Sequence, residues 1–103
     1  VDLVTATNGP EGLEKYSKGK FDALVVDCYM PLGDGFEMVS EIRKREEAEG
    51  LNRSLIFALS ADDSAKNIQR CYRYGFDEFV AKPYTAETYN HILDKLSDYS
   101  KND

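Results

Sequence analysis

The sequence is poor in the residues that build metal clusters, cross-links and membrane spans. It has no tryptophan, one histidine and two cysteines among 103 residues. Cys28 and Cys71 are too few and too far apart in the chain to suggest a disulfide framework or a zinc site, so a reducing, cytoplasmic setting is the default expectation. No apolar run approaches the roughly 20 residues that span a bilayer, and no signal-peptide pattern opens the chain. We therefore expect no membrane contact by this chain.

Positive charge is also scarce. The chain has 13 Lys and Arg against 19 Asp and Glu, a formal net charge of −6. Nonspecific nucleic-acid binding needs clustered cations against phosphates, so no direct contact with nucleic acid is expected. The hydrophobic content of 42% with 31% charged residues is typical of a globular protein, and residues 1–103 fit a single domain with a real core.

One stretch joins an apolar run to a carboxylate. The run from Ala23 to Val26 ends on Asp27, and a loop containing Pro31 and Gly33 follows. Short apolar runs bounded by turn residues are typical of strands buried on both faces of a parallel sheet. A charge is costly inside such a sheet, so we expect Asp27 at the carboxyl end of its strand, where open α/β sheets bind ligands.

The rest of the chain alternates strand and helix patterns. The pattern predicts strands over 2–7, 22–26, 54–59 and 79–81, and helices after Asn8 and over 35–48, 63–74 and 86–99. Asn8 and Thr85 are predicted N-caps, and Gly19 and Gly75 are predicted helix stops. This order indicates an α/β fold of four strands and four helices, a parallel sheet with helices on both faces.

The helices have predicted inward and outward faces. The charged run from Arg43 to Glu49 is predicted to be a solvated, solubilising face, and His91 is predicted to be exposed. The inward positions are expected at helical spacing; they are Leu13, Tyr16, Phe36, Val39, Ile42, Ala65, Ile68, Tyr72, Tyr89, Ile92, Leu93, Leu96 and Tyr99. Cys28 alternates to the other side from Asp27 and is predicted to fill core space.

Three predicted strands end on side chains that carry chemistry: Asp27, Ser60 and Lys82. The carboxyl ends of parallel strands share one edge of a sheet, so these side chains are expected to converge. A carboxylate can attack a phosphoryl group and form an aspartyl-phosphate, and a lysine cation, the Ser60 hydroxyl and the backbone amide of Ala61 can bind phosphoryl oxygens. A divalent cation is normally also needed, because it neutralises the negative charges of the phosphoryl group and the carboxylate as they approach each other.

The same residues resemble the receiver domains of two-component response regulators and hybrid histidine kinases. The resemblance covers essentially the whole chain, which is more similar to hybrid-kinase receivers than to those of transcription factors. It is carried by Val25-Val26-Asp27, Met30-Pro31, Asp34-Gly35, Ala58-Leu59-Ser60-Ala61, Gly75-Phe76-Asp77 and Lys82-Pro83. It implies a flavodoxin-like fold and a phosphoacceptor signalling domain rather than an enzyme.

The resemblance also implies residue roles. Asp27 accepts phosphate from the phosphohistidine of a histidine kinase or histidine phosphotransfer protein. Ser60 is the switch hydroxyl, Lys82 pairs with phosphate, and Phe79 is the aromatic ring that turns inward when the hydroxyl moves. The peptide bond between Lys82 and Pro83 is commonly cis in the family.

The resemblance is weakest at the N-terminal end of the sequence. Family members open with a strand that ends in an acidic pair binding Mg²⁺, whereas this sequence opens at what resembles the second strand. Mg²⁺ is still expected, on Asp27 and the backbone carbonyl of Tyr29, with the other acidic ligands absent from the sequence. The nearby acids Asp34, Asp62 and Asp63 are not favoured as substitutes.

Three explanations for the front of the chain stay open. The sequence is a fragment of a longer protein, or another chain supplies the strand through a homodimer or strand swap. The third is that strand 2–7 pairs directly with strand 22–26.

Other functions stay open as well. A degenerate receiver that docks a partner without phosphate is favoured by the absent acids. An aspartyl-phosphate phosphatase carries Asp-x-Asp at the nucleophile, but here Tyr29 takes the second position. A flavin protein shares the fold, but the loops lack a run that cradles phosphate. Taken singly, Ser60 is typical of a helix cap, Lys82 of a solvated lysine and Phe79 of static core.

Overall fold

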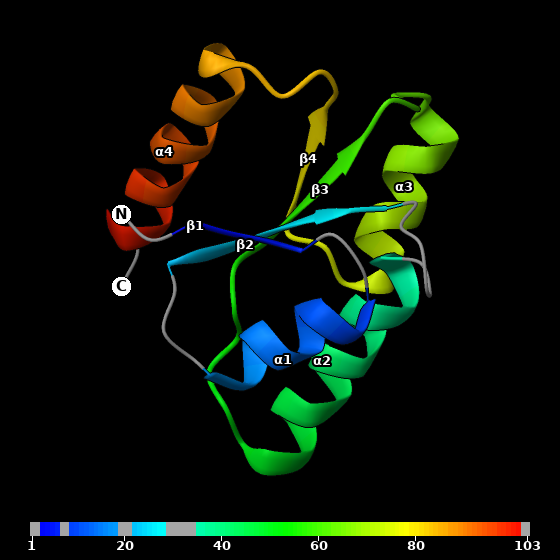
Figure 1. Cartoon of the computed structure of the whole chain (residues 1–103), viewed down its shortest axis with the longest axis vertical. Coiled ribbons are helices and arrows are strands. Elements are labelled where there is room, and N and C mark those ends of the chain that lie inside the picture. The colour runs from blue at the N-terminus through cyan, green and yellow to red at the C-terminus, as the bar shows by residue number, and fades with distance from the viewer. Residues whose placement is uncertain (1–2, 7–8, 19–21, 29–34, 102–103) are drawn as a thin grey trace.

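The structure is a computed structural model that describes residues 3–6, 9–18, 22–28 and 35–101. The predicted alternation of strands and helices is confirmed (Figure 1). In order the elements are β1 (Leu3–Ala6), α1 (Gly9–Lys18), β2 (Ala23–Asp27), α2 (Gly35–Glu49), β3 (Ile56–Ser60), α3 (Ala65–Tyr74), β4 (Glu78–Ala81) and α4 (Ala86–Lys101).

The four strands form one parallel sheet in the order β1-β2-β3-β4. β1 pairs directly with β2, with Leu3 opposite Ala23, so direct pairing is the arrangement that the structure adopts. Neighbouring parallel strands are joined by right-handed crossovers, and in a sheet of sequential order these place every connecting helix on the same face.

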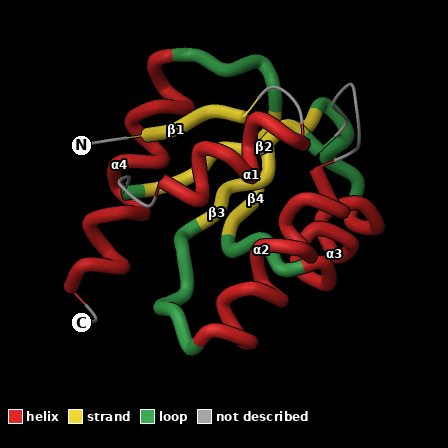
Figure 2. Tube along the Cα trace, turned by 60° about the horizontal axis from the view of Figure 1, so that its bottom comes forward, coloured by secondary structure: helices red, strands yellow, loops and turns green. Residues whose placement is uncertain are grey.

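The two faces of the sheet are therefore covered unequally. α1, α2 and α3 lie along one face, and α4 stands apart on the other (Figures 1 and 2). Alternate residues of each strand point to opposite faces and make two buried clusters. The larger, beneath α1 to α3, contains Ala6, Tyr16, Leu24, Val26, Cys28, Phe36, Met38, Val39, Ile42, Ile56, Ala58, Cys71 and Phe76. The smaller, beneath α4, contains Ala23, Val25, Phe57, Leu59, Val80 and Ile92.

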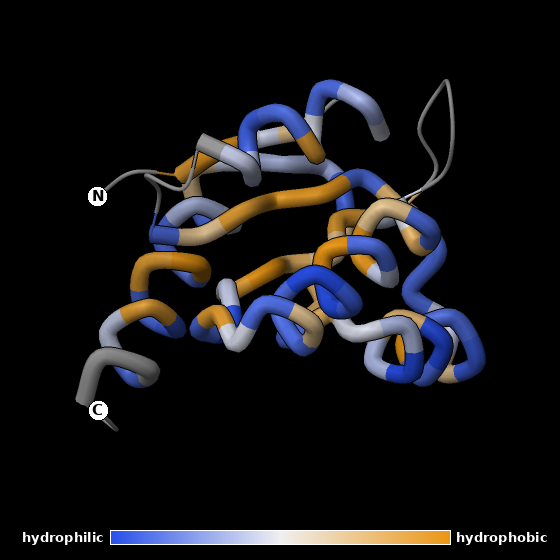
Figure 3. The backbone as a smooth tube through the Cα atoms, turned by 90° about the horizontal axis from the view of Figure 1, so that it is seen from below, coloured by the Kyte–Doolittle hydropathy of each residue, from blue (hydrophilic) through white to orange (hydrophobic). Residues whose placement is uncertain are grey.

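The predicted inward faces of α1 and α2 agree in their main positions with the structure, since Tyr16, Phe36 and Ile42 are buried. On α4 Ile92 is buried and Leu96 packs at the margin of its cluster, but the prediction that Tyr89 faces inward was wrong, because its side chain is exposed. The strand tubes in the centre of Figure 3 are largely orange, while the helices alternate between blue and orange along their length.

The predicted inward face of α3 was wrong. Ala65 and Tyr72 are exposed, and the buried residues of this helix are Asn67 and Cys71. The helix is capped by Ser64, whose side chain accepts a hydrogen bond from the Asn67 backbone amide. An amide occupies a position for which hydrophobic periodicity expects an apolar residue.

Two helix ends follow the prediction. Gly75 ends α3 in the left-handed region at φ 115°, and Thr85 Oγ1 accepts a hydrogen bond from the Thr88 amide at 3.4 Å before α4. The Lys82–Pro83 bond is cis, as the resemblance implied. The predicted cap Asn8 and stop Gly19 lie outside the described residues.

Among the described residues, none of the helices combines the length and hydropathy that crossing a lipid bilayer requires.

Candidate functional site

Asp27 and Lys82 meet at the carboxyl edge of the sheet. Asp27 is the last residue of β2, and Lys82 directly follows β4. Lys82 Nζ donates a hydrogen bond to Asp27 Oδ2 at 2.5 Å, and the two side chains are 39% and 27% exposed. A carboxylate with a cation beside it is thus open to solvent at the edge where the sequence predicted it.

Gly35 brings the start of α2 close to this carboxylate. Its amide donates to the Cys28 carbonyl at 3.0 Å, and a Cβ at Gly35 would lie 2.5 Å from the Asp27 carbonyl oxygen. Only a glycine allows so close an approach of two backbones. The first turn of α2 therefore lies against the backbone of Asp27.

Ser60 ends the strand between β2 and β4, within one residue of both partners. Leu59 lies opposite Asp27 and Ser60 lies opposite Ala81 in the sheet register. The Ser60 side chain is buried, and its hydroxyl oxygen accepts from the Asp62 amide at 3.1 Å and from Asn67 Nδ2 at 3.5 Å. The three predicted side chains share one edge, but the Ser60 hydroxyl bonds to the start of α3. Ala61 follows at this edge and is exposed.

Phe79 lies in β4, half-buried against the larger cluster. Burial and, less strongly, the charge of Glu78 raise the pKa of Tyr72, which lies on the neighbouring helix α3. The cluster that Phe79 packs against also contains Cys71 of α3, the helix whose Asn67 bonds to Ser60.

The described residues do not make a complete magnesium site. Mg²⁺ prefers six oxygen ligands, including one or two carboxylates. Within the described part of the chain no group of three metal-ligating side chains is present, and Asp27 is bonded to Lys82. The Asp62 carboxylate accepts from the Ser64 amide, which lowers its pKa. The predicted ligand Tyr29 and the nearby Asp34 lie outside the described residues.

The prediction that Arg43 to Glu49 form a solvated face was wrong for two residues. Arg43 bonds Glu46 Oε1 at 2.7 Å and Asp77 Oδ2 at 2.8 Å, and it also donates to the carbonyls of Ser54 and Gly75. The Arg43, Glu46 and Asp77 side chains are only 14%, 6% and 10% exposed. These five residues, which we call the amino-edge network, lie where β3 and β4 begin.

The network also binds backbone amides just before β3 and at its first residue. Glu46 Oε2 accepts from the Ser54 amide at 2.7 Å, and Asp77 Oδ2 accepts from the Ile56 amide at 2.8 Å. β3 starts at Ile56 rather than at the predicted Ser54, whose amide bonds to the Glu46 side chain. Burial alone raises the Glu46 pKa, but hydrogen bonds from Arg43 and Ser54 outweigh it and leave that pKa lowered. The i, i+3 spacing of Arg43 and Glu46 was the available sequence signal.

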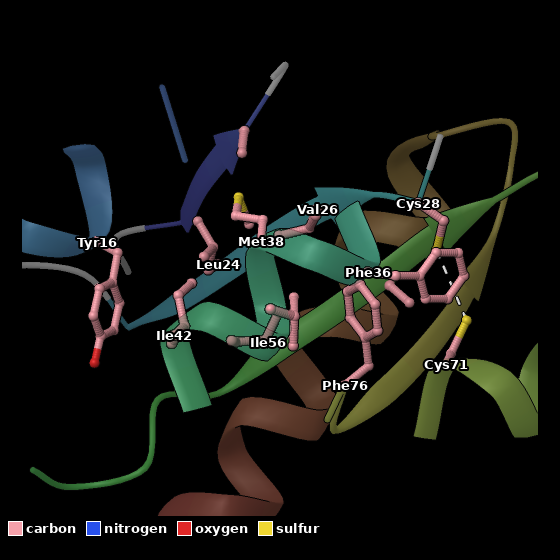
Figure 4. Close-up of a cluster of buried hydrophobic side chains, with 13 residues drawn as sticks. Tyr16, Leu24, Val26, Cys28, Phe36, Met38, Ile42, Ile56, Cys71 and Phe76 are labelled. Atoms are coloured by element: carbon pink, nitrogen blue, oxygen red, sulfur yellow. Dashed lines mark hydrogen bonds between the residues drawn. The ribbon is translucent and has the colours of Figure 1, made fainter. Parts of the chain in front are cut away.

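Cys28 and Cys71 lie side by side despite their separation in the chain. Their Sγ atoms are 3.8 Å apart as free thiols, and both residues are fully buried (Figure 4). Burial raises the pKa of both thiols. Cys28 belongs to the larger cluster, on the opposite face from its neighbour Asp27, so its prediction as core filler agrees with the structure. His91 is exposed, as predicted.

The family model described as Response regulator receiver domain matches residues 1–94. Among curated proteins, the chain is 38% identical over 96 residues to "Hybrid signal transduction histidine kinase A" of Dictyostelium discoideum. It is 30% identical over 97 residues to "Virulence sensor protein BvgS" of Bordetella bronchiseptica. These matches cover 92% of the chain in each case but only 4% and 8% of the relatives, so the chain spans a small part of their length.

Solved structures show the same fold. Chemotaxis response regulator CheY4 of Vibrio cholerae matches with a TM-score of 0.74 and 28% identity, over 88% of this chain and 73% of that one. The receiver domain of sensor histidine kinase PA1611 from Pseudomonas aeruginosa matches with a TM-score of 0.71 and 26% identity, over 88% and 72%. That receiver domain has a magnesium ion coordinated in its active site cleft.

Proposed function

Since the chain belongs to the response regulator receiver family, we propose that Asp27 accepts a phosphoryl group from a phosphohistidine and thereby switches a partner surface. The observation that carries the proposal is the solvent-accessible Asp27–Lys82 ion pair at the carboxyl edge of the sheet. The donor is a histidine kinase or a histidine phosphotransfer protein. The domain acts as an acceptor and does not turn over a substrate of its own.

In the proposed transfer, Asp27 is the nucleophile and Lys82 stabilises the charge that develops. A carboxylate oxygen of Asp27 attacks phosphorus, the new P–O bond forms, and the P–N bond to the imidazole breaks with its electron pair staying on the ring nitrogen. Charge develops on the equatorial phosphoryl oxygens, so a cation placed beside them stabilises the transition state. Lys82, already 2.5 Å from Asp27, takes that position.

Ser60 and Ala61 bind the remaining phosphoryl oxygens in this proposal. The Ser60 hydroxyl donates one hydrogen bond, and the Ala61 backbone N–H donates another. Because Ser60 now bonds to the start of α3, its movement carries the signal to α3 and to Phe79. The surface around Phe79 is then the one that a partner senses.

The curated relatives support a place in a hybrid histidine kinase. The chain covers only a small share of those kinases. We propose that it serves as the receiver of such a protein and passes phosphate within a phosphorelay. Mg²⁺ is proposed as a cofactor on the strength of the family, with Asp27 as the ligand that the described residues supply.

Incubation of the protein with acetyl phosphate and Mg²⁺, followed by intact-mass measurement, tests the proposal. The expected result is an acid-labile gain of about 80 Da, the mass of one phosphoryl group. Asp27→Asn is the matched control and should gain nothing. No adduct on the wild-type protein, or an equal adduct on Asp27→Asn, would overturn the assignment.

A phosphate-independent docking module is the second candidate. It is favoured because the described residues hold no group of three metal-ligating side chains. Binding of a histidine phosphotransfer protein, measured by calorimetry with and without acetyl phosphate, separates the two functions. An affinity that stays the same in both conditions and in Asp27→Asn supports docking without phosphate.

A further inference from the structure

Asn67 is a buried amide on the sheet-facing side of α3, only 5% exposed. Its Nδ2 donates to the Asp62 carbonyl at 2.7 Å and lies 3.5 Å from Ser60 Oγ. A buried amide is tolerated when its hydrogen-bonding groups find partners. Here those partners are the switch hydroxyl and the loop that follows it.

The loop between β3 and α3 is tied together by hydrogen bonds. The Asp62 amide donates to Ser60 Oγ at 3.1 Å, and Asp62 Oδ1 accepts from the Ser64 amide at 3.1 Å. Ser64 Oγ in turn accepts a hydrogen bond from the backbone amide of Asn67 at 3.3 Å. Asn67 completes this ring of hydrogen bonds from α3. Its side chain donates to the Asp62 carbonyl, and the Asp62 backbone amide donates to the Ser60 hydroxyl oxygen.

Ser60 and the loop that binds it lie on the opposite face of the sheet from the Asp27–Lys82 ion pair, because side chains alternate along each strand. Ile56 and Ala58, which share the strand face of Ser60, belong to the cluster beneath α1 to α3. Val25, which shares the face of Asp27, belongs to the cluster beneath α4. To donate to a phosphoryl oxygen on Asp27, the Ser60 hydroxyl must turn away from Asp62 and Asn67.

We propose that Asn67 is a positioning residue that holds the Ser60 hydroxyl in its resting orientation, so that phosphorylation of Asp27 is coupled to release of the first turn of α3. The proposal rests on the function proposed for Asp27. The Ser60 hydroxyl thus has a resting orientation and an orientation turned toward Asp27. Phosphorylation shifts the equilibrium between these two states only through contacts that differ between them. The bonds from Asn67 and Asp62 to Ser60 are contacts that the resting state has and the turned state gives up.

Asn67→Leu tests this coupling, because leucine has a similar volume and no donor. Phosphorylation by acetyl phosphate and Mg²⁺ should become faster by about five-fold, the size of one ordinary hydrogen bond. Gln69→Leu is the matched control on the exposed side of the same helix and should leave the rate unchanged. If Asn67→Leu does not fold, as judged by circular dichroism, Asn67→Ala makes the same test without added bulk.

The decisive comparison uses a protein without the Ser60 hydroxyl. In a Ser60→Ala background Asn67→Leu should no longer change the phosphorylation rate, because the hydroxyl that Asn67 is proposed to position is absent. A merely structural role for Asn67 would give the same change with or without the hydroxyl. An effect that persists in Ser60→Ala overturns the proposal.

Hydrogen exchange of the Asp62 amide gives a readout that needs no phosphate. The amide should exchange slowly in the wild-type protein and in Gln69→Leu, and faster in Asn67→Leu and Ser60→Ala. Unchanged exchange in Asn67→Leu contradicts the holding role. If no variant is phosphorylated at all, the function proposed for Asp27 fails, and the exchange data alone decide whether Asn67 holds Ser60.

Discussion

The two ends of the sheet use the same kinds of side chain in different ways. At the amino edge, Arg43 bonds two carboxylates and two carbonyls, and all three charged side chains are nearly buried. At the carboxyl edge, Lys82 bonds Asp27 in an ion pair that solvent reaches. At the amino edge the charged side chains are joined by several hydrogen bonds and ion pairs, whereas at the carboxyl edge a single ion pair is accessible to a ligand.

Under the proposed function, this difference separates the residues that stabilise the fold from the residues that react with phosphate. A buried ion pair that loses one partner strands the other charge away from water, at a cost of about 3–5 kcal/mol. An exposed pair contributes about 0–1 kcal/mol, so exchanging its partner for a phosphoryl group costs the fold little. The amino-edge network is therefore expected to set stability, and the Asp27–Lys82 pair to set reactivity.

Arg43→Met should give the largest loss of stability. It leaves Glu46 without its cation and leaves Asp77 with only the exposed Arg53, which is 2.9 Å from Asp77 Oδ1, so the free energy of unfolding should fall by about 3–5 kcal/mol in urea denaturation. Lys44→Met, on the exposed side of the same helix, should stay within about 0.5 kcal/mol of wild type. Equal losses in the two variants would show that the network does not support the fold.

Glu46→Gln should weaken the fold at neutral pH and flatten its acid dependence. The folded-state pKa of Glu46 lies below its ordinary value of 4.5, so its contribution is present above that value and is lost as pH falls through the lowered pKa. The expected loss at pH 7 is about 1.5–3 kcal/mol, the value of a charge-assisted hydrogen bond. Thermal unfolding at several pH values measures it. Glu47→Gln, at an exposed neighbour, should keep the wild-type acid dependence.

Gly75→Ala should cost less, about 1–3 kcal/mol. Gly75 has φ 115°, and a Cβ there would lie 2.9 Å from Arg43 Cγ in the amino-edge network. Gly50 also has a positive φ, of 63°, but a Cβ there would meet nothing within 4 Å. Chemical denaturation should therefore rank Gly50→Ala as the milder change, and the reverse order would argue against close packing at Gly75.

Lys82→Met should change stability least. The exposed ion pair predicts a loss of no more than about 1 kcal/mol in the same denaturation experiment. A loss as large as that of Arg43→Met would mean that the carboxyl edge also holds the fold, and the contrast between the two edges would disappear.

The sequence was informative about the carboxyl edge because strand ends are local features. Asp27, Ser60 and Lys82 each follow a short apolar run, and a parallel sheet brings such ends together whatever the details of packing. The orientation of the Ser60 hydroxyl was not predictable, because it depends on where Asn67 faces. Hydrophobic periodicity assigned the wrong inward side to α3, because one of its two buried residues, Asn67, is polar. The Asn67 side chain bonds to Asp62 in the preceding loop.

The amino-edge network was missed because its partners come from distant parts of the chain. Arg43 meets Asp77 across 34 residues, and neither residue carries an apolar pattern that would predict burial. The contact of Cys28 with Cys71 was hidden in the same way, across 43 residues. The pairing of β1 with β2 stayed open for a different reason, because the receiver domains that the sequence resembles place a further strand between these two.

The most direct test of the contrast between the two edges is the fraction of folded protein phosphorylated by acetyl phosphate in Lys82→Met and in Arg43→Met. Lys82→Met should lose most of the adduct while remaining folded. Arg43→Met should keep wild-type phosphorylation per folded molecule although it is much less stable. If Arg43→Met loses as much adduct per folded molecule as Lys82→Met, the division between a structural edge and a reactive edge is contradicted.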